Sequence, residues 1–225
     1  MPYMRPRYLF RKRIYLHDRL CALADGVYAV VITLLVLDLQ VPRIPGDADP
    51  QLIADLYQQI PNFVAYAIAF ILVGFFWANH HRIFASFPVC GKWTLHLNII
   101  HLFFISLTPY SASLIGHYEG DQIATIIFSV NLGLSSLSLS MLAVHVLPKD
   151  EKETDPSDGI WVKLPWWDVF SGTGIAIVSI AVSFWSITAA LLLWPLAMLK
   201  HAILMVHSPP PNPGISPSIT RERSN

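Results

Sequence analysis

The sequence predicts an all-α integral membrane protein with six transmembrane helices per chain and both termini in the cytoplasm. Of its 225 residues, 54% are hydrophobic and only 13% are charged, whereas soluble domains carry roughly 25% charge. The apolar residues come in runs of about 20, long enough to cross ~30 Å of hydrocarbon as a helix. The alternation over about ten residues that is typical of a membrane β-barrel is not visible. Helical spans therefore fit the sequence far better than barrel strands.

Six apolar runs qualify as spans. In chain order they cover residues 20–39, 60–79, 97–116, 122–146, 167–183 and 185–200. The segments between them divide the Lys and Arg residues unequally: fourteen fall on one side of the membrane, and one, Arg43, falls on the other. Because cytoplasmic loops carry the excess of basic residues, both termini are predicted to be cytoplasmic. The first span is too long for a cleavable signal peptide and is expected to act as an uncleaved anchor. We expect a multi-pass protein of the cell (plasma) membrane.

The chain divides into three parts. Residues 1–18 form a basic cytoplasmic tail, which either lies on the anionic inner leaflet or only fixes the topology. Residues 19–204 form one transmembrane domain without a recognisable internal repeat. Residues 205–225 are rich in Pro and Ser and are expected to be disordered. Cys21 and Cys90 both map to the cytoplasmic side, where thiols stay reduced, so no disulfide is expected.

Two of the middle spans carry local signals. In the third span, Pro109 predicts a kink and His101 has the pattern of a hydrogen-bonded core histidine. The fourth span contains several small hydroxyl residues, which let helices approach closely and indicate packing more than chemistry. They are Ser135, Ser136, Ser138 and Ser140.

The first span, RLCALADGVYAVVITLLVLDL, contains more polar residues than a plain anchor needs. At 100° per residue, one sector of about 60° collects a set of small, apolar and hydroxyl residues, with Leu34 on its edge. This set consists of Arg19, Gly26, Val30, Thr33 and Leu37. Asp25 lies on a different side. A carboxylate in the membrane is costly and usually faces protein or water, so Asp25 belongs either to a functional polar network or to the solvated interface.

The second span ends in FFWANHHRIF, in which Trp77, His80 and His81 are spaced i, i+3, i+4. This spacing predicts that the three side chains gather on one face. A histidine pair suits a metal-dependent enzyme, but no Cys, Asp or Glu lies within two turns. Because the first two spans are antiparallel neighbours, the three side chains are better explained as hydrogen-bonding partners of Asp25 at the same depth. Phosphate-binding glycine loops and a TVGYG-type carbonyl filter are absent from the sequence.

These residues carry a resemblance to a known family. RLCALADGVYAVVITLLVLDLQVP resembles the first helix of the transmembrane protein 175 family, the endolysosomal potassium channels and their bacterial relatives. The family pattern is (R/K)xxxFSD followed by a G/A-V-F-A-I-x-I-T-like run. FFWANHHRIF is similar to the family's W-x-x-H-H segment, and NIIHLFFISLTPYSASLIG is similar to its third helix. The similarity covers nearly all of residues 19–200, as a single six-span repeat of the bacterial kind.

The resemblance implies a homotetramer in which four first helices line a central pore. It places the narrowest ring at Val30, with further pore-facing residues at Thr33, Leu34 and Leu37. It also implies an interhelical polar network that clamps the pore helix. The network residues are Arg19, Asp25, Trp77, His80 and His81.

The sequence departs from the family pattern at two places. Leu23-Ala24 replaces Phe-Ser, so one hydroxyl of the network is missing. Val30 replaces the usual isoleucine or leucine of the constriction and is one methylene smaller. Both departures bear on gating and selectivity more than on fold.

The function predicted from residues and resemblance together is a potassium-preferring cation channel with a hydrophobic constriction that gates by dewetting. The alternatives are a weakly selective proton or cation leak channel and, less favoured, a secondary transporter, since inverted repeats and broken helices are not visible. No enzymatic activity, cofactor, metal or nucleic acid is expected. The expected partners are potassium ions, the lipid bilayer and further copies of the chain.

Overall fold

The computed structural model describes residues 7–42, 49–85, 91–146 and 170–207, and these residues form helices and their connections without any β-strand. The predicted all-α class is therefore confirmed. In chain order, the elements are α1 (Arg7–Leu34), the 3-10 helix η1 (Leu35–Asp38), α2 (Asp49–Gln58), α3 (Ile60–Ala85), α4 (Lys92–Ser106), α5 (Thr108–His117), α6 (Gln122–Val146), α8 (Ser171–Ser183) and α9 (Ile187–His207).

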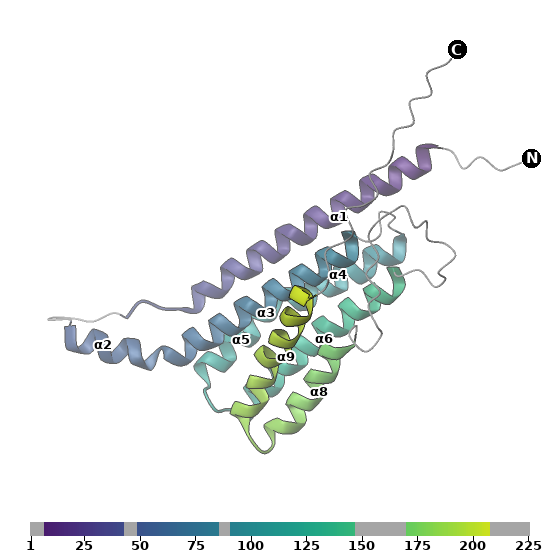
Figure 1. The fold of residues 1–225 in the computed structure, drawn as a ribbon. Coiled ribbons are helices and arrows are strands. Elements are labelled where there is room, and N and C mark those ends of the chain that lie inside the picture. Colours follow the sequence, from purple (N-terminus) through teal and green to yellow (C-terminus); the bar gives the residue numbers. More distant parts are fainter. Residues whose placement is uncertain (1–6, 43–48, 86–90, 147–169, 208–225) are drawn as a thin grey trace, which may run out of the picture.

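The long helices form a bundle with α6 at its centre, where it contacts α3, α4, α5, α8 and α9. α1 runs along one side of the bundle and packs on α3 and α4 (Figure 1). α8 and α9 form a hairpin on another side (Figure 1). One hydrophobic core joins the helices, with contributions from α1, α3, α4 and α6. α1 therefore has one side on the core and another side that is exposed in the described part of the chain.

Among the described residues, four helical segments are long and apolar enough to cross a membrane: His17–Asp38, Ile60–Ala85, Lys92–His117 and Gln122–Val146. They coincide with the first four predicted spans. α8 has 13 residues, which amounts to about 20 Å of helix, less than the ~30 Å of a hydrocarbon core. The predicted start of the fifth span, residues 167–169, lies outside the described residues. Six complete spans and the orientation of the termini stay predictions.

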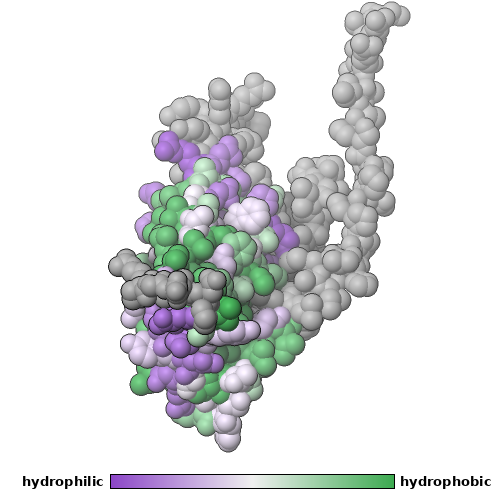
Figure 2. All heavy atoms as spheres, turned by 90° about the vertical axis from the view of Figure 1, so that its left-hand side faces the viewer, coloured by the Kyte–Doolittle hydropathy of each residue, from purple (hydrophilic) through white to green (hydrophobic). Residues whose placement is uncertain are grey.

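The surface agrees with a membrane environment. Green, hydrophobic residues cover much of the described surface in Figure 2, and hydrophilic residues gather near its top and in a patch lower on the same face. Large apolar side chains are exposed along α3 and α4, among them Phe63, Ile71 and Phe103. Exposed apolar area on this scale suits lipid or protein contact more than water.

The third predicted span is broken where the sequence indicates a kink. α4 ends at Ser106, Leu107 makes a tight turn by donating its N–H to the carbonyl oxygen of Phe104 (3.2 Å), and α5 starts at Thr108. Pro109 occupies the first turn of α5, where its missing N–H costs no helical hydrogen bond. The amide of Asn131 on α6 donates to Thr108 Oγ1 (3.2 Å) and Ser111 Oγ (3.1 Å). A polar side chain of the central helix thus supports the break.

The small residues of α6 allow the close helix packing that the sequence predicts. Ser136 lies so close to Gly172 of α8 that an added Cβ there would collide with it. Ser129 and Ser179 share a hydrogen bond of 2.9 Å between these two helices. Ser179 also lies 2.9 Å from the carbonyl oxygen of Ala190 on α9. These hydroxyls join the α8–α9 hairpin to the bundle.

The helix ends differ from the predicted boundaries. α1 begins at Arg7, so the first helix extends into the predicted N-terminal tail 1–18. α9 continues to His207, three residues into the predicted tail 205–225. The rest of both tails and Cys90 lie outside the described residues.

Candidate functional site

The two faces of α1 are clearly distinct. One face is buried against the bundle at a spacing of three to four residues, as expected for a helix with one packed side. Its members are Leu20, Ala24, Tyr28, Val31 and, at the start of η1, Leu35, each at most 3% exposed. The opposite face is exposed in the described part of the chain. This face contains every residue that the sequence assigns to the pore.

The four predicted pore residues are all exposed. Val30 is 55% exposed, Leu34 43% and Leu37 72%, and Thr33 also belongs to the exposed class. The Thr33 hydroxyl lies 2.8 Å from the carbonyl oxygen of Val30 and 3.1 Å from that of Ala29, so it donates within its own helix. Its oxygen lone pairs stay available on the exposed side. The structure therefore groups these residues on one side of a single helix, with one hydroxyl among branched aliphatic side chains.

Asp25 contacts the second long helix. The indole Nε1 of Trp77 donates a hydrogen bond of 2.9 Å to Asp25 Oδ1, across 52 residues of sequence. The imidazole of His81 stacks on the Trp77 ring with 5.8 Å between centroids and 29° between planes. Arg19 lies on the exposed side of α1, six residues before Asp25. The structure thus brings Asp25, Trp77 and His81 together near one end of α1.

His80 points elsewhere. Its side chain is buried, and its Nε2 lies 2.7 Å from Oδ1 of Asn98 on α4. The expectation that Trp77, His80 and His81 gather on one face therefore needs correction. Trp77 and His81 face outward, and His80 faces the core. Positions i and i+3 differ by about 60° on a helix, which is enough to place them on either side of the boundary between core and surface.

Sequence analysis missed a buried polar contact on the opposite side of α1. The Tyr28 hydroxyl lies 2.6 Å from Nε2 of His101 on α4. The other ring nitrogen of His101, Nδ1, lies 3.1 Å from both the carbonyl oxygen of Ser135 and the hydroxyl of Ser138 on α6. In the sequence, Tyr28 has no feature that separates it from the apolar residues of the helix. Its spacing of four residues from Ala24 and eight from Leu20 is the signal that could have predicted a buried side chain.

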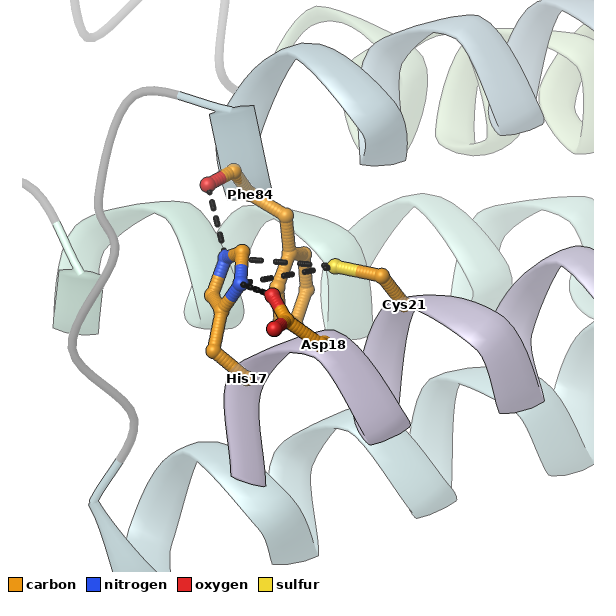
Figure 3. A network of polar contacts seen from close by, with 4 residues as sticks. All are labelled: His17, Asp18, Cys21 and Phe84. Carbon is orange, nitrogen blue, oxygen red and sulfur yellow. Dashed lines mark hydrogen bonds and ion pairs between the residues drawn. The ribbon is translucent and has the colours of Figure 1, made fainter. Parts of the chain in front are cut away.

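A second contact that the sequence did not reveal lies around His17 (Figure 3). The charge distribution predicts that this part of α1 is near the cytoplasm. His17 Nε2 donates to the carbonyl oxygen of Phe84, at 3.0 Å, close to the end of α3. Its Nδ1 lies 3.4 Å from Asp18 Oδ1, and Cys21 Sγ lies within 3.9 Å of both ring nitrogens. The rings of His17 and Phe84 also pack at 5.7 Å. This contact ties the beginning of the apolar part of α1 to α3.

The other end of α1 is tied to α5. Ser113 donates its hydroxyl to Asp38 Oδ1 at 2.8 Å, and His117 Nδ1 lies 3.7 Å from Asp38 Oδ2. Asp38 is the last residue of η1, directly after the exposed Leu37. The bundle therefore holds α1 at His17 and Tyr28, and it holds the following η1 at Asp38.

The described residues contain no group of three or more His, Cys, Asp or Glu side chains placed to hold a metal ion. The buried histidines His80 and His101 instead contact amide, hydroxyl and carbonyl groups, and their rings stack at 5.7 Å with 10° between planes. These groups act as connections between helices.

A helical bundle with several apolar helices long enough to cross a bilayer is typical of a multi-pass membrane protein. Residues 19–109 match the family model described as endosomal/lysosomal potassium channel TMEM175. A potassium channel of Chryseobacterium sp. (strain P1-3) is 29% identical over 185 residues, covering 79% of this chain and 92% of the relative. A potassium channel of Streptomyces collinus is also 29% identical, over 57% of this chain and 63% of the relative.

Together these matches show that the chain is similar to the TMEM175 family over residues 19–109 and to bacterial proteins named potassium channels. The crystal structure of a lysosomal potassium-selective channel TMEM175 homolog from Chamaesiphon minutus covers 86% of this chain and all of its own, with a TM-score of 0.71 at 24% identity. At that identity the match shows a shared fold. The mouse endosomal/lysosomal proton channel TMEM175 is 37% identical over 98 residues, only 20% of its length.

Proposed function

We propose that this chain is a potassium-preferring cation channel that assembles as a homotetramer around its first helices. The observation that carries the proposal is the exposed apolar face of α1, with Val30 and Leu37 on the side opposite the bundle. Four copies that turn this face to a common axis would form two apolar rings, with Thr33 and Leu34 between them. The names of the bacterial relatives as potassium channels support the ion preference.

The mechanism follows from the chemistry of the rings. An ion in an apolar constriction cannot keep its hydration shell and finds no replacement ligands, so the closed rings exclude it. Conduction requires the rings to dilate and to admit water. The Thr33 oxygen, which keeps lone pairs on the exposed side, supplies a polar contact at that depth. In this proposal Val30, Leu34 and Leu37 form the gate, and Thr33 influences ion preference.

The contacts at the other residues of the predicted network suit a clamp on the pore helix. Asp25 bound to Trp77, with His81 stacked on the indole, would hold α1 against α3 while the rings move. His80 would contribute from the core side through Asn98. We assign Arg19 to the same end of the clamp from its position on α1.

The proposed topology has six spans, both termini in the cytoplasm, and insertion in the cell membrane. It is tested in a chain in which Cys21 and Cys90 are replaced by serine. A cysteine at Glu119 is expected to react with an impermeant reagent in intact cells. A cysteine at Lys152 is expected to react only after permeabilisation, and labelling of this position in intact cells would contradict the topology.

The deciding experiment for function is a bilayer recording of the purified protein with K⁺ on one side and Na⁺ on the other. A passive current whose reversal potential favours K⁺ supports the proposal. Absence of any current from protein that has assembled correctly, as judged by native mass spectrometry of the tetramer, would contradict it. The same spectrum tests the assembly, because any other copy number rejects the fourfold pore.

The second candidate is a channel that passes protons with weak selectivity among cations. Two observations favour it: vertebrate relatives are named proton channels, and Val30 is smaller than the residues usual in the family pattern. In a pH gradient with symmetric K⁺, a reversal potential that follows the proton gradient would identify this activity. A reversal potential at zero would exclude it.

A further inference from the structure

Tyr28 forms a hydrogen-bonded connection through the bundle behind the exposed face of α1. Its side chain is 1% exposed, and its hydroxyl lies 2.6 Å from His101 Nε2. His101 is fully buried and reaches Ser135 and Ser138 on α6 through its other nitrogen. Three helices, α1, α4 and α6, therefore meet through one imidazole ring.

The direction of these hydrogen bonds follows from the groups involved. The carbonyl oxygen of Ser135 can only accept, and it already accepts from the Ser138 hydroxyl at 2.9 Å. Nδ1 of His101 therefore carries the proton and donates to Ser135, with Ser138 Oγ as a second acceptor. In the neutral ring, Nε2 then has a lone pair and accepts from the Tyr28 hydroxyl. Each group has one role, so the removal of the Tyr28 hydroxyl leaves Nε2 without its donor.

The position of this connection on the helix gives it a mechanical consequence. At 100° per residue, Tyr28 lies about 160° from Val30 on α1, and Leu37, in η1 directly after α1, is likewise exposed. A contact that draws Tyr28 toward the bundle therefore draws both apolar side chains away from the axis on the opposite side. The His101 ring cannot easily follow α1, because it is stacked on His80 and packed near Phe76.

We propose that Tyr28 and His101 are positioning residues that hold the first helix outward and so favour the wet, conducting state of the gate. The inference rests on the proposed function. Ala24 and Tyr28 are one turn apart on the same buried face.

The test uses the single variants Tyr28→Phe and His101→Leu and the double variant that combines them. Each single variant strands one buried polar group, which lowers the thermal midpoint of the purified tetramer. The double variant replaces both partners with apolar side chains and is expected to regain most of that midpoint. His101→Leu leaves Ser138 bonded to Ser135, so no further group loses its partner. Tyr110→Phe, which removes an exposed hydroxyl, is the control.

Measurement of the current distinguishes a positioning role of Tyr28 and His101 from a merely structural role. If the connection positions α1, the open-to-closed ratio falls by about threefold to tenfold in Tyr28→Phe, and it stays low in the double variant despite the recovered thermal midpoint. Wild-type current in Tyr28→Phe would overturn the proposal, and so would a current that recovers together with stability in the double variant. If the variants at His101 fail to assemble, Tyr28→Phe is compared with Ile105→Val, a core change of similar expected cost, and equal currents in the two would overturn it. A wild-type protein without any current would instead contradict the proposed function.

Discussion

The two faces of the first helix contain similar residues, but one face is buried against the bundle and the other is exposed. On the bundle side, Val31 and Leu35 are buried, and the nearby polar group of Tyr28 has its partner in another helix. On the other side, Val30 and Leu37 are exposed, and the polar group of Thr33 bonds only to its own backbone. The first face fixes where the helix lies. The second face is exposed, and for this reason we propose that it lines the pore.

The comparison predicts that the same substitution acts differently at adjacent residues. Val31→Asn places an amide without partners in the core and loses packing, which should cost about 2–4 kcal/mol of stability. Val30→Asn should leave the fold intact, because Val30 is exposed, and should raise the current by easing the wetting of the constriction. Thermal unfolding in detergent and bilayer current are measured for both variants.

Two results would contradict the predictions for Val31→Asn and Val30→Asn. A large loss of stability in Val30→Asn would mean that the exposed face is required for the fold of the single chain. An unchanged current in an assembled Val30→Asn tetramer, together with an unchanged current in Leu37→Asn, would mean that this face does not line the pore. Ile32→Asn, which alters a partly buried residue of the same helix, is expected mainly to reduce assembly.

The contrast between these faces was partly predictable from sequence. Helical periodicity alone placed Val30, Thr33 and Leu37 on one side, because side-chain direction in a regular helix depends only on residue number. The break at Pro109 was predictable for a similar reason, since proline removes a backbone donor wherever it occurs. The fold class followed from composition and run length. All of these are local properties of the chain.

The polar contacts were less predictable because they depend on pairs of helices. The direction of His80 depends on Asn98, 18 residues later, and the role of Tyr28 depends on His101, 73 residues later. Helical periodicity does not predict contacts between two different helices, so neither pair could be found from residue spacing. The approach of α1 to α3 through His17 and the Phe84 carbonyl was missed for the same reason, since a backbone acceptor leaves no mark in the sequence.

The next prediction concerns the boundary between the faces, where Asp25 meets Trp77. Trp77→Phe keeps an aromatic ring but removes the indole donor, so stability should fall by about 1 kcal/mol. Asp25→Ala should produce a similar loss, and the double variant should lose no more than either single variant, because both changes remove the same hydrogen bond. The measurement is the thermal midpoint of the solubilised tetramer. If Asp25→Ala leaves the midpoint unchanged, Asp25 is merely solvated at the interface and the clamp is rejected.

Ser113→Ala removes the donor to Asp38 in η1, which follows α1. Its effect on global stability should be small, about 0.5 kcal/mol, because Asp38 is partly exposed and can bond to water. Amide hydrogen exchange over residues 35–39 should speed up, since η1 loses its contact with α5. Exchange over residues 20–31 should stay as in the wild type. Faster exchange in both segments would show that α1 is not held independently at its two ends.

The smallest expected change in stability belongs to Thr33, and here the two faces differ most clearly in function. Thr33→Val keeps the branched shape and removes a hydroxyl that donates only to the Val30 and Ala29 carbonyl oxygens, which keep their backbone partners. Stability should therefore stay within about 0.5 kcal/mol of the wild type. The preference for K⁺ over Na⁺ should change, because Thr33 carries the one polar side-chain group among the four proposed pore residues. Thr33→Ser, which restores the hydroxyl, should return the reversal potential toward the wild-type value. If Thr33→Val and the wild type have the same reversal potential, ion preference arises elsewhere in the chain, and the exposed face of α1 acts only as an apolar gate.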